Sequence, residues 1–201
     1  MFGDPVDNTM NWPTRHLREL TSKIGSGATP KGGNASYKDH GVSLIRSMHV
    51  YNGFFDYEDL AHIDDDQAKK LENVEVLSQD VLLNITGASV ARCCIVPESV
   101  LPARVNQHVC IIRCLKDVVL PIYINQLLIA PTYQSKLWDM AEAAGATRQA
   151  LTKEQVENLV IIVPPVDIQR QFANFICETD KSKYDSTVSS EDAWIGGDMC
   201  A

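Results

Sequence analysis

The chain has 201 residues, 45% of them hydrophobic, and a formal net charge of −8 at pH 7. This length fits one domain with an appendage, or two small domains, and the negative balance argues against a protein that binds nucleic acid with its whole surface. The sequence contains no uncharged apolar stretch long enough for a membrane-spanning helix and no signal-peptide pattern, so we expect a cytoplasmic protein that does not enter a membrane.

Short strands separated by loops are predicted for the first part of the chain. Residues 12–24 fit a short strand or helix that enters the domain, and residues 25–41 fit a loop rich in glycine, serine and asparagine. Residues 42–50 alternate with a period of two, which predicts a strand. Asn52 and Gly53 then give a tight-turn signal.

A surface helix and three apolar strands are predicted for the middle of the chain. Residues 64–74 open on three aspartates, which are favourable at a helix N-terminus because of the helix dipole. Apolar runs predict strands at residues 80–86, 90–97 and 108–115. Four cysteines lie in or beside these strands: Cys93, Cys94, Cys110 and Cys114. A free thiol there behaves as a small hydrophobic group, and we favour this interpretation over metal binding because no C-x-x-C motif occurs.

Helices dominate the last part of the chain. Pro121 fits the first turn of a helix that Pro131 ends, and a second helix covers residues 135–144. Thr152 and Gln155 have the spacing of a capping box.

That capping box opens a short helix before a brief strand at residues 160–163. After two prolines, residues 166–183 form an amphipathic helix, and residues 184–201 have no period and are expected to be disordered.

The charge is unevenly distributed along the chain. Residues 12–50 carry six lysines and arginines against two acids, whereas residues 51–80 carry nine acids against two lysines. One interpretation of the acidic block is a solvated face. The other is that a positive potential is confined to the face that holds the glycine-rich segment GSGATPKGG, residues 25–33.

The glycine-rich segment fits neither common nucleotide-binding motif. Lys31 is followed by glycine, whereas a Walker loop requires serine or threonine, and Pro30 stands where a dinucleotide fingerprint has its third glycine. No G-x-S-x-G elbow occurs, the five histidines show no pairing pattern, and the aspartates at 64–66 lack calcium-loop spacing. We therefore predict no catalytic residue, no metal ligand and no cofactor bound by this chain itself.

Several weak motifs follow one another in an informative order. Trp12 precedes a leucine-rich entry, Gly27 and Pro30 form a G-x-x-P pattern, and Tyr37 and Gly41 precede a predicted strand. They are followed by D-V-L-L at 80–83, I-T-G at 85–87, G-A-T-R at 145–148 and V-I-I-V-P-P at 160–165, before Gln169. Together these motifs resemble the target recognition domain of the specificity subunit of type I restriction–modification systems, over about residues 1–183.

The resemblance implies an α+β fold: a mostly β target recognition domain with C-terminal helices and the start of a long coiled-coil-type spacer helix. It assigns residues 1–11 to a linker-like segment, residues 12–164 to the recognition domain, residues 165–183 to the amphipathic helix and residues 184–201 to a disordered tail.

The resemblance also implies a subunit without a catalytic centre. Specificity subunits of this family read a bipartite target with two recognition domains and hold an adenine methyltransferase that uses S-adenosylmethionine; an ATP-dependent restriction translocase can join the complex. Because this sequence shows one such domain, we expect half a specificity subunit that reads one half-site of double-stranded DNA. It would act as a homodimer on an inverted repeat or beside a second half subunit.

Three loops are expected to form the DNA-binding face, namely residues 25–40, 87–92 and 145–150. Residues 106–108 are a fourth candidate, for which a plain loop before a strand is an equally good interpretation. Basic, hydroxyl and amide side chains suit phosphate contacts and base-edge readout. The predicted DNA-binding residues are Thr29, Lys31, Asn34, Ser36, Tyr37, Lys38, Arg46, Gly87, Ser89, Arg92, Gln107, Thr147, Arg148 and Gln149.

The amphipathic helix after the two prolines is the predicted subunit contact. One short helix cannot bury its own apolar stripe, so we expect it to pack on the methyltransferase or on a second copy through Ile168, Phe172, Phe175 and Ile176. The alternative function is a protein-interaction or inhibitory module that does not read DNA, which the acidic net charge slightly favours.

Overall fold

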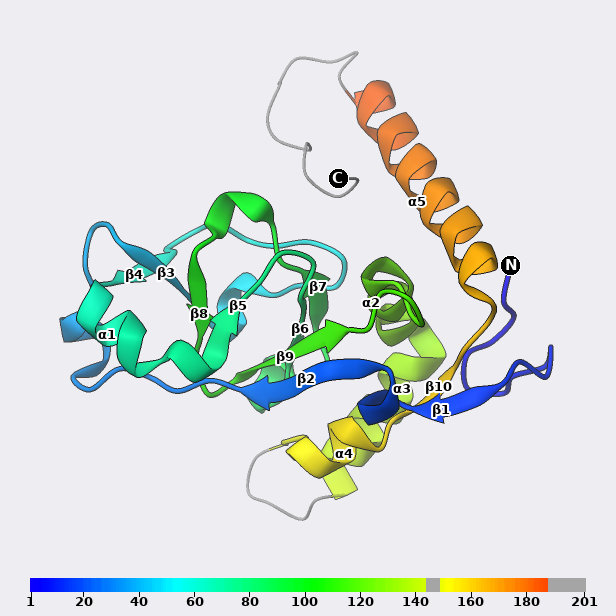
Figure 1. Ribbon diagram of the computed structural model, residues 1–201, viewed down its shortest axis with the longest axis horizontal. Helices are drawn as coiled ribbons and strands as arrows, with labels where there is room; N and C mark the ends of the chain where they lie inside the picture. Colours follow the sequence, from blue (N-terminus) through cyan, green and yellow to red (C-terminus); the bar gives the residue numbers. More distant parts are fainter. Residues whose placement is uncertain (144–148, 188–201) are drawn as a thin grey trace.

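The computed structural model describes residues 1–143 and 149–187, with the side chains of all of these except residues 34 and 180–187. The fold is α+β (Figure 1). Five α-helices lie in this part of the chain: α1 (Asp65–Lys70), α2 (Pro121–Ile129), α3 (Pro131–Ala143), α4 (Lys153–Glu157) and α5 (Val166–Thr187).

Two four-stranded sheets form the β-structure. The first, in the order β2-β9-β6-β7, is antiparallel and contains β2 (Thr21–Ser26), β9 (Val109–Cys114), β6 (Val81–Asn84) and β7 (Cys93–Ile95). The second, in the order β4-β3-β8-β5, contains β4 (Ala61–Ile63), β3 (Val42–Ile45), β8 (Ala103–Val105) and β5 (Glu75–Val76), with β3 and β8 parallel. A separate pair joins β1 (Thr14–His16) to β10 (Val160–Ile162).

Short 3-10 turns connect many of these elements. They are η1 (Leu17–Glu19), η2 (Gly33–Ser36), η3 (Ser47–His49), η4 (Glu72–Val74), η5 (Gly87–Ser89) and η6 (Glu98–Val100).

The first sheet separates two hydrophobic cores. Successive side chains of a strand point to opposite faces. On one face Leu83, Cys93 and Ile112 pack in a core that also contains residues of α2, α3 and α4. On the other face Leu82 and Cys94 pack in the core of the second sheet. Because both faces are buried, a one-residue slip of register would exchange the two cores, so the register is strongly specified.

The four strand cysteines are free, buried thiols, as predicted. Burial raises the pKa of Cys94, Cys110 and Cys114 to about 12, so these thiols stay protonated at neutral pH. Cys93 and Cys94 are adjacent but face different cores, which explains why both positions carry a small apolar side chain.

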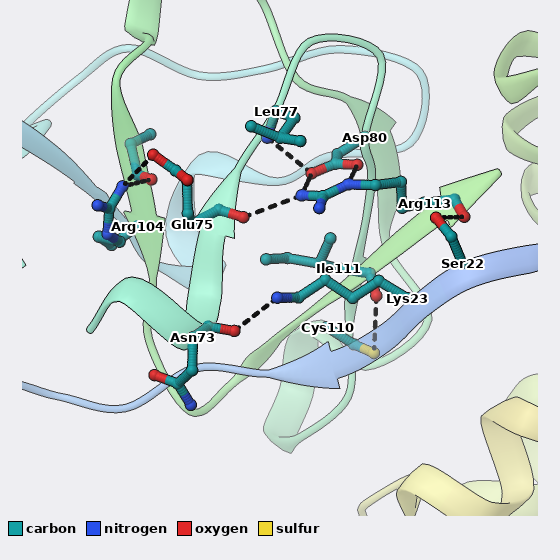
Figure 2. Close-up of polar contacts among 11 residues, drawn as sticks. Ser22, Lys23, Asn73, Glu75, Leu77, Asp80, Arg104, Cys110, Ile111 and Arg113 are labelled. Atoms are coloured by element: carbon teal, nitrogen blue, oxygen red, sulfur yellow. Dashed lines mark hydrogen bonds and ion pairs between the residues drawn. The ribbon is translucent and has the colours of Figure 1, made fainter. Parts of the chain in front are cut away.

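An ion pair with a buried carboxylate connects the two sheets (Figure 2). Asp80, just before β6, is fully buried and accepts two hydrogen bonds from the Arg113 guanidinium of β9, at 2.8 and 2.7 Å. Arg113 also donates to the Glu75 carbonyl of β5, and the Leu77 amide donates to Asp80. The hydrogen bonds that Arg113 donates to the Asp80 carboxylate raise the pKa of Arg113. The pair thus links β6, β9 and β5 at one end of the strands.

Helix α5 leaves the domain from an anchored base (Figure 1). The fully buried Gln169 side chain accepts from the Leu120 amide at 2.9 Å and donates to the Val118 and Pro164 carbonyls. Beside it, the Phe2 ring contacts two other aromatic rings edge to face. Its centroid lies 5.0 Å from that of Phe172 and 5.1 Å from that of Tyr123. The N-terminal segment is therefore packed against the first turns of α5.

Several predicted boundaries need correction. The strand expected over residues 42–50 ends at Ile45, because the chain turns into η3. Pro131 begins α3 rather than only ending α2. Helix α5 continues to Thr187, past the expected start of the disordered tail at Tyr184. The rest of that tail, residues 188–201, lies outside the described residues.

Other local predictions are confirmed. Thr152 and Gln155 form a reciprocal capping box at α4, and Pro121 is the first residue of α2. A second capping box, between Asp64 and Gln67, begins α1, so the first of the three aspartates serves as its cap.

Substitution of Asp80 tests the role of its ion pair. Asp80→Asn removes the buried carboxylate to which the partly exposed Arg113 donates, so we expect a loss of about 1.5–3 kcal/mol in the free energy of unfolding. The matched control is Asp167→Asn, whose pair with Arg170 is exposed, and it should cost less than about 1 kcal/mol. Urea denaturation of both variants gives the comparison, and equal losses would contradict it.

Candidate nucleic-acid interface

Several strand ends meet at one surface of the domain. The Gly27 amide, just after β2, donates to the Asn106 carbonyl after β8 at 3.1 Å. The Asn106 amide donates to the carbonyl of Ile45, the last residue of β3. The Ile85 amide, after β6, donates to the backbone carbonyl of His108, before β9. We call this surface the strand-end face and define it as residues 26–31, 45–48, 84–92, 106–108 and 149–150.

Gly27 is required where the start of the glycine-rich loop approaches the end of β8. A Cβ atom there would lie 1.7 Å from the carbonyl oxygen of Val105 and 2.9 Å from that of Asn106. Only glycine permits this approach of two backbones. The buried Pro30 follows three residues later. The glycine-rich loop is thus anchored to the neighbouring strand ends at its start.

A chain of polar contacts crosses the strand-end face. The Thr29 hydroxyl donates to the Gln107 amide oxygen, and the Gln107 amide nitrogen lies 3.0 Å from His108 Nε2. His108 Nδ1 lies 2.6 Å from the Thr86 hydroxyl. These contacts connect the loop at residues 25–40 with residues 106–108 and with Thr86, the residue before the loop at 87–92.

The described end of the loop at residues 145–150 joins the same surface. The Gly87 amide donates to the Gln149 carbonyl at 2.9 Å, and Thr86 pairs with Ala150 as an isolated bridge. Gly87 adopts a φ of +74° with no atom near the place of a Cβ, so the loop is open there. Two predicted DNA-binding residues of this loop, Thr147 and Arg148, lie outside the described residues.

The predicted cations differ in their surroundings. Lys31 is exposed and forms no ion pair with any described side chain. Lys38 lies 3.6 Å from the Asp64 carboxylate, and both side chains are about half exposed. Such a pair contributes little to stability, so it leaves Lys38 free to exchange partners.

Two predicted arginines rest on aromatic rings. The Arg46 guanidinium lies 5.7 Å from the centroid of the Tyr37 ring and donates to the Asp59 carbonyl. That of Arg92 lies 4.4 Å from the centroid of Tyr51. Cation–π contacts hold both guanidinium groups without neutralising them, so their charge remains available to a phosphate.

The other predicted DNA-binding residues, in the loop at residues 25–40 and in η5, contribute less to the strand-end face. The Ser36 hydroxyl donates to the Gly33 carbonyl at 2.7 Å, and Tyr37 packs against the core of the second sheet. The side chain of Asn34 lies outside the described residues. Ser89 is half-buried in η5, where its carbonyl accepts from the Arg92 amide.

Thr86 is a polar residue of the strand-end face that was not among the predicted DNA-binding residues. It lies in the I-T-G motif at 85–87, as a hydroxyl residue at the end of an apolar strand. Its role depends on His108, which is 22 positions further along the chain.

The predicted subunit-contact residues are divided between two environments. Ile168 and Phe172 pack against the core of the same chain, so this half of the apolar stripe is not left to a partner. Phe175 is 55% exposed, and Ile176 is half-buried. The part of the stripe that remains open therefore lies further along α5, beyond the anchored base.

No metal-binding cluster of three or more histidine, cysteine or acidic residues occurs within residues 1–143 and 149–187. No described helix is both long enough and apolar enough to cross a membrane.

Residues 10–188 match the model of the type I restriction modification DNA specificity domain family. The chain belongs to this family. It is therefore a target recognition domain of a type I restriction–modification specificity subunit, as the order of its motifs predicted. No curated protein sequence matches the chain.

Solved specificity subunits share the fold of this type I specificity domain. The HsdS subunit from Thermoanaerobacter tengcongensis has 15% sequence identity and a TM-score of 0.62, over 92% of this chain and 41% of that one. The S subunit from M. genitalium has 14% identity and a TM-score of 0.58, over 87% and 40%. A chain from a type I restriction–modification system whose assembly and conformational transition were studied has 16% identity and a TM-score of 0.61, over 89% and 40%. This chain thus spans about two fifths of each relative.

Alanine at Gly27 tests the anchoring of the glycine-rich loop. Since the added methyl group would collide with the Val105 carbonyl, we expect Gly27→Ala to lower the free energy of unfolding by about 1–3 kcal/mol. Gly25→Ala is the matched control, because nothing lies within 4 Å of a Cβ at that position. Thermal or urea denaturation measures both. Equal stability of the two variants would show that the approach to Val105 does not constrain the loop.

Proposed function

We propose that the strand-end face reads one half-site of a bipartite DNA target and that α5 docks the adenine methyltransferase. The observation that supports the proposal most directly is the contact chain from Thr29 to Thr86. It brings together side chains that can pair with base edges, from loops far apart in the sequence.

The arrangement suits recognition because the loops are attached to a fixed frame. Both strands that flank residues 106–108, β8 and β9, are buried in the sheets. Loops on a rigid scaffold can present polar side chains without a large ordering cost on binding. Lys31, Arg46 and Arg92 supply positive charge near this face, although the whole chain is acidic.

In this proposal the chain itself is not an enzyme and holds no cofactor. S-adenosylmethionine belongs to the methyltransferase subunit, and ATP belongs to the restriction translocase that joins through the complex. The second half-site requires a second recognition domain, from another copy of this chain or from a different one. The complex would work in the cytoplasm, where its DNA target lies.

Docking of the methyltransferase is assigned to the outer part of α5. Phe175 exposes 55% of its surface there, whereas Phe172 is held by the domain. An exposed aromatic side chain on an anchored helix is typical of a protein contact.

Expression of this chain with its methyltransferase, followed by sequencing of methylated genomic DNA, tests the function. We expect adenine methylation at one bipartite motif, and fluorescence anisotropy should show tighter binding to a duplex with that motif than to a scrambled one. Binding to the methyltransferase without sequence-selective DNA binding would overturn the proposal in favour of an inhibitory interaction module.

Lys31 tests the electrostatic part of the interface. Lys31→Ala should weaken binding to target and non-target duplexes alike and reduce the slope of log affinity against log salt by about 1, because one phosphate contact is lost. Lys116→Ala is the control, since this exposed lysine lies beyond the opposite end of β9. A salt slope that is unchanged in Lys31→Ala would exclude the phosphate contact.

A further inference from the structure

The Gln107 side chain is exposed on the strand-end face, yet its amide group is held from two sides. Its oxygen accepts from the Thr29 hydroxyl, and its nitrogen lies 3.0 Å from His108 Nε2. An exposed glutamine without such partners would be free to rotate. Here both atoms of the amide are restrained in one orientation, which would lower the entropy lost on binding.

The direction of the hydrogen bonds follows from the groups themselves. An amide nitrogen only donates, so His108 Nε2 must be the acceptor and carries no proton. The neutral imidazole then carries its proton on Nδ1, which donates to the Thr86 hydroxyl at 2.6 Å. A hydroxyl can either donate or accept, so the Thr86 contact fixes the position of the His108 ring, and the unprotonated Nε2 of His108 in turn places the amide nitrogen of Gln107.

The amide retains two free hydrogen-bonding positions. An amide nitrogen has two N–H donors and an amide oxygen has two lone pairs, and the contacts to His108 and Thr29 use one of each. One donor and one acceptor therefore remain on Gln107. Adenine presents the complementary pair in the major groove, the N7 acceptor and the N6 amino donor, whereas guanine presents two acceptors.

We propose that Gln107 reads an adenine in the major groove of the target and that Thr29, His108 and Thr86 are positioning residues for it. This inference rests on the proposed function and deepens it by assigning one base pair of the half-site. If guanine stood at that position, the Gln107 oxygen would face guanine O6. Both atoms are acceptors, so no hydrogen bond could form between them. We expect discrimination of roughly tenfold or more at that single base pair.

The test uses the complex of this chain with its methyltransferase, for which the methylated motif of the unsubstituted protein is determined first. Absence of any motif at that stage would refute the proposed function itself. With a motif in hand, Gln107→Ala should lose selectivity at one A·T pair of the half-site and keep it at the other positions. The side chain is exposed, so its removal leaves both cores intact.

Thr29 offers a matched pair of variants for the positioning role. Thr29→Ser keeps the hydroxyl and should keep full selectivity. Thr29→Val has nearly the same shape without a donor, so it should relax selectivity at the same base pair as Gln107→Ala. His108→Phe should relax that pair too. Adding His108→Phe to Gln107→Ala should cause no further loss, because both act through one contact.

Three results would overturn the assignment. Gln107→Ala could leave the motif unchanged, or it could relax a pair other than A·T, and either would exclude adenine readout by Gln107. Equal behaviour of Thr29→Ser and Thr29→Val would exclude the hydroxyl as a positioning group.

Discussion

The ion pair between Asp80 and Arg113 holds the two sheets in a fixed relation at one end, and the strand-end face depends on that relation at the other. Asp80 lies just before β6 and Arg113 lies near the end of β9, so the ion pair connects the two central strands of the first sheet to each other and, through the Glu75 carbonyl, to β5. At the opposite end the same sheets are joined by the backbone contacts of Gly27 and Asn106. Because the two sheets are connected at both ends, the loops of the strand-end face have little freedom to move apart.

The distribution of charges on this frame is compatible with the DNA-binding face that we propose for an acidic chain. The acids of residues 64–66 begin α1, where Asp64 caps the helix. The cations Arg46 and Arg92 are held on aromatic rings without neutralisation, and Lys31 is exposed. Net charge describes the whole molecule, whereas DNA binding depends on the potential of one face.

Local chemistry made much of the fold predictable. The apolar runs of β6 and β9, the proline at the start of α2 and the capping box of α4 each carry their signal within a few residues. The strands β4, β5 and β8 contain two or three residues each, too few for a detectable period, and they exist because they pair with β3 and with one another.

The side-chain contacts of the proposed site and the surroundings of the proposed subunit contact were predictable only in outline. Loop composition indicated which segments carry polar side chains, but the contact between Thr29 and Gln107 spans 78 positions and no local pattern encodes it. The apolar stripe of α5 was visible as a period, yet a period does not state what covers it. Phe2, at the other end of the chain, covers Phe172.

Site-specific photocrosslinking tests the central claim, that the strand-end face contacts DNA while the outer part of α5 contacts protein. A benzophenone amino acid is placed at the exposed Ala88 of η5 or at Phe175 of α5, and the complex with the methyltransferase and its target duplex is irradiated. We expect a crosslink to DNA from position 88 and a crosslink to the methyltransferase from position 175. Crosslinks to DNA from position 175, with none from position 88, would contradict it.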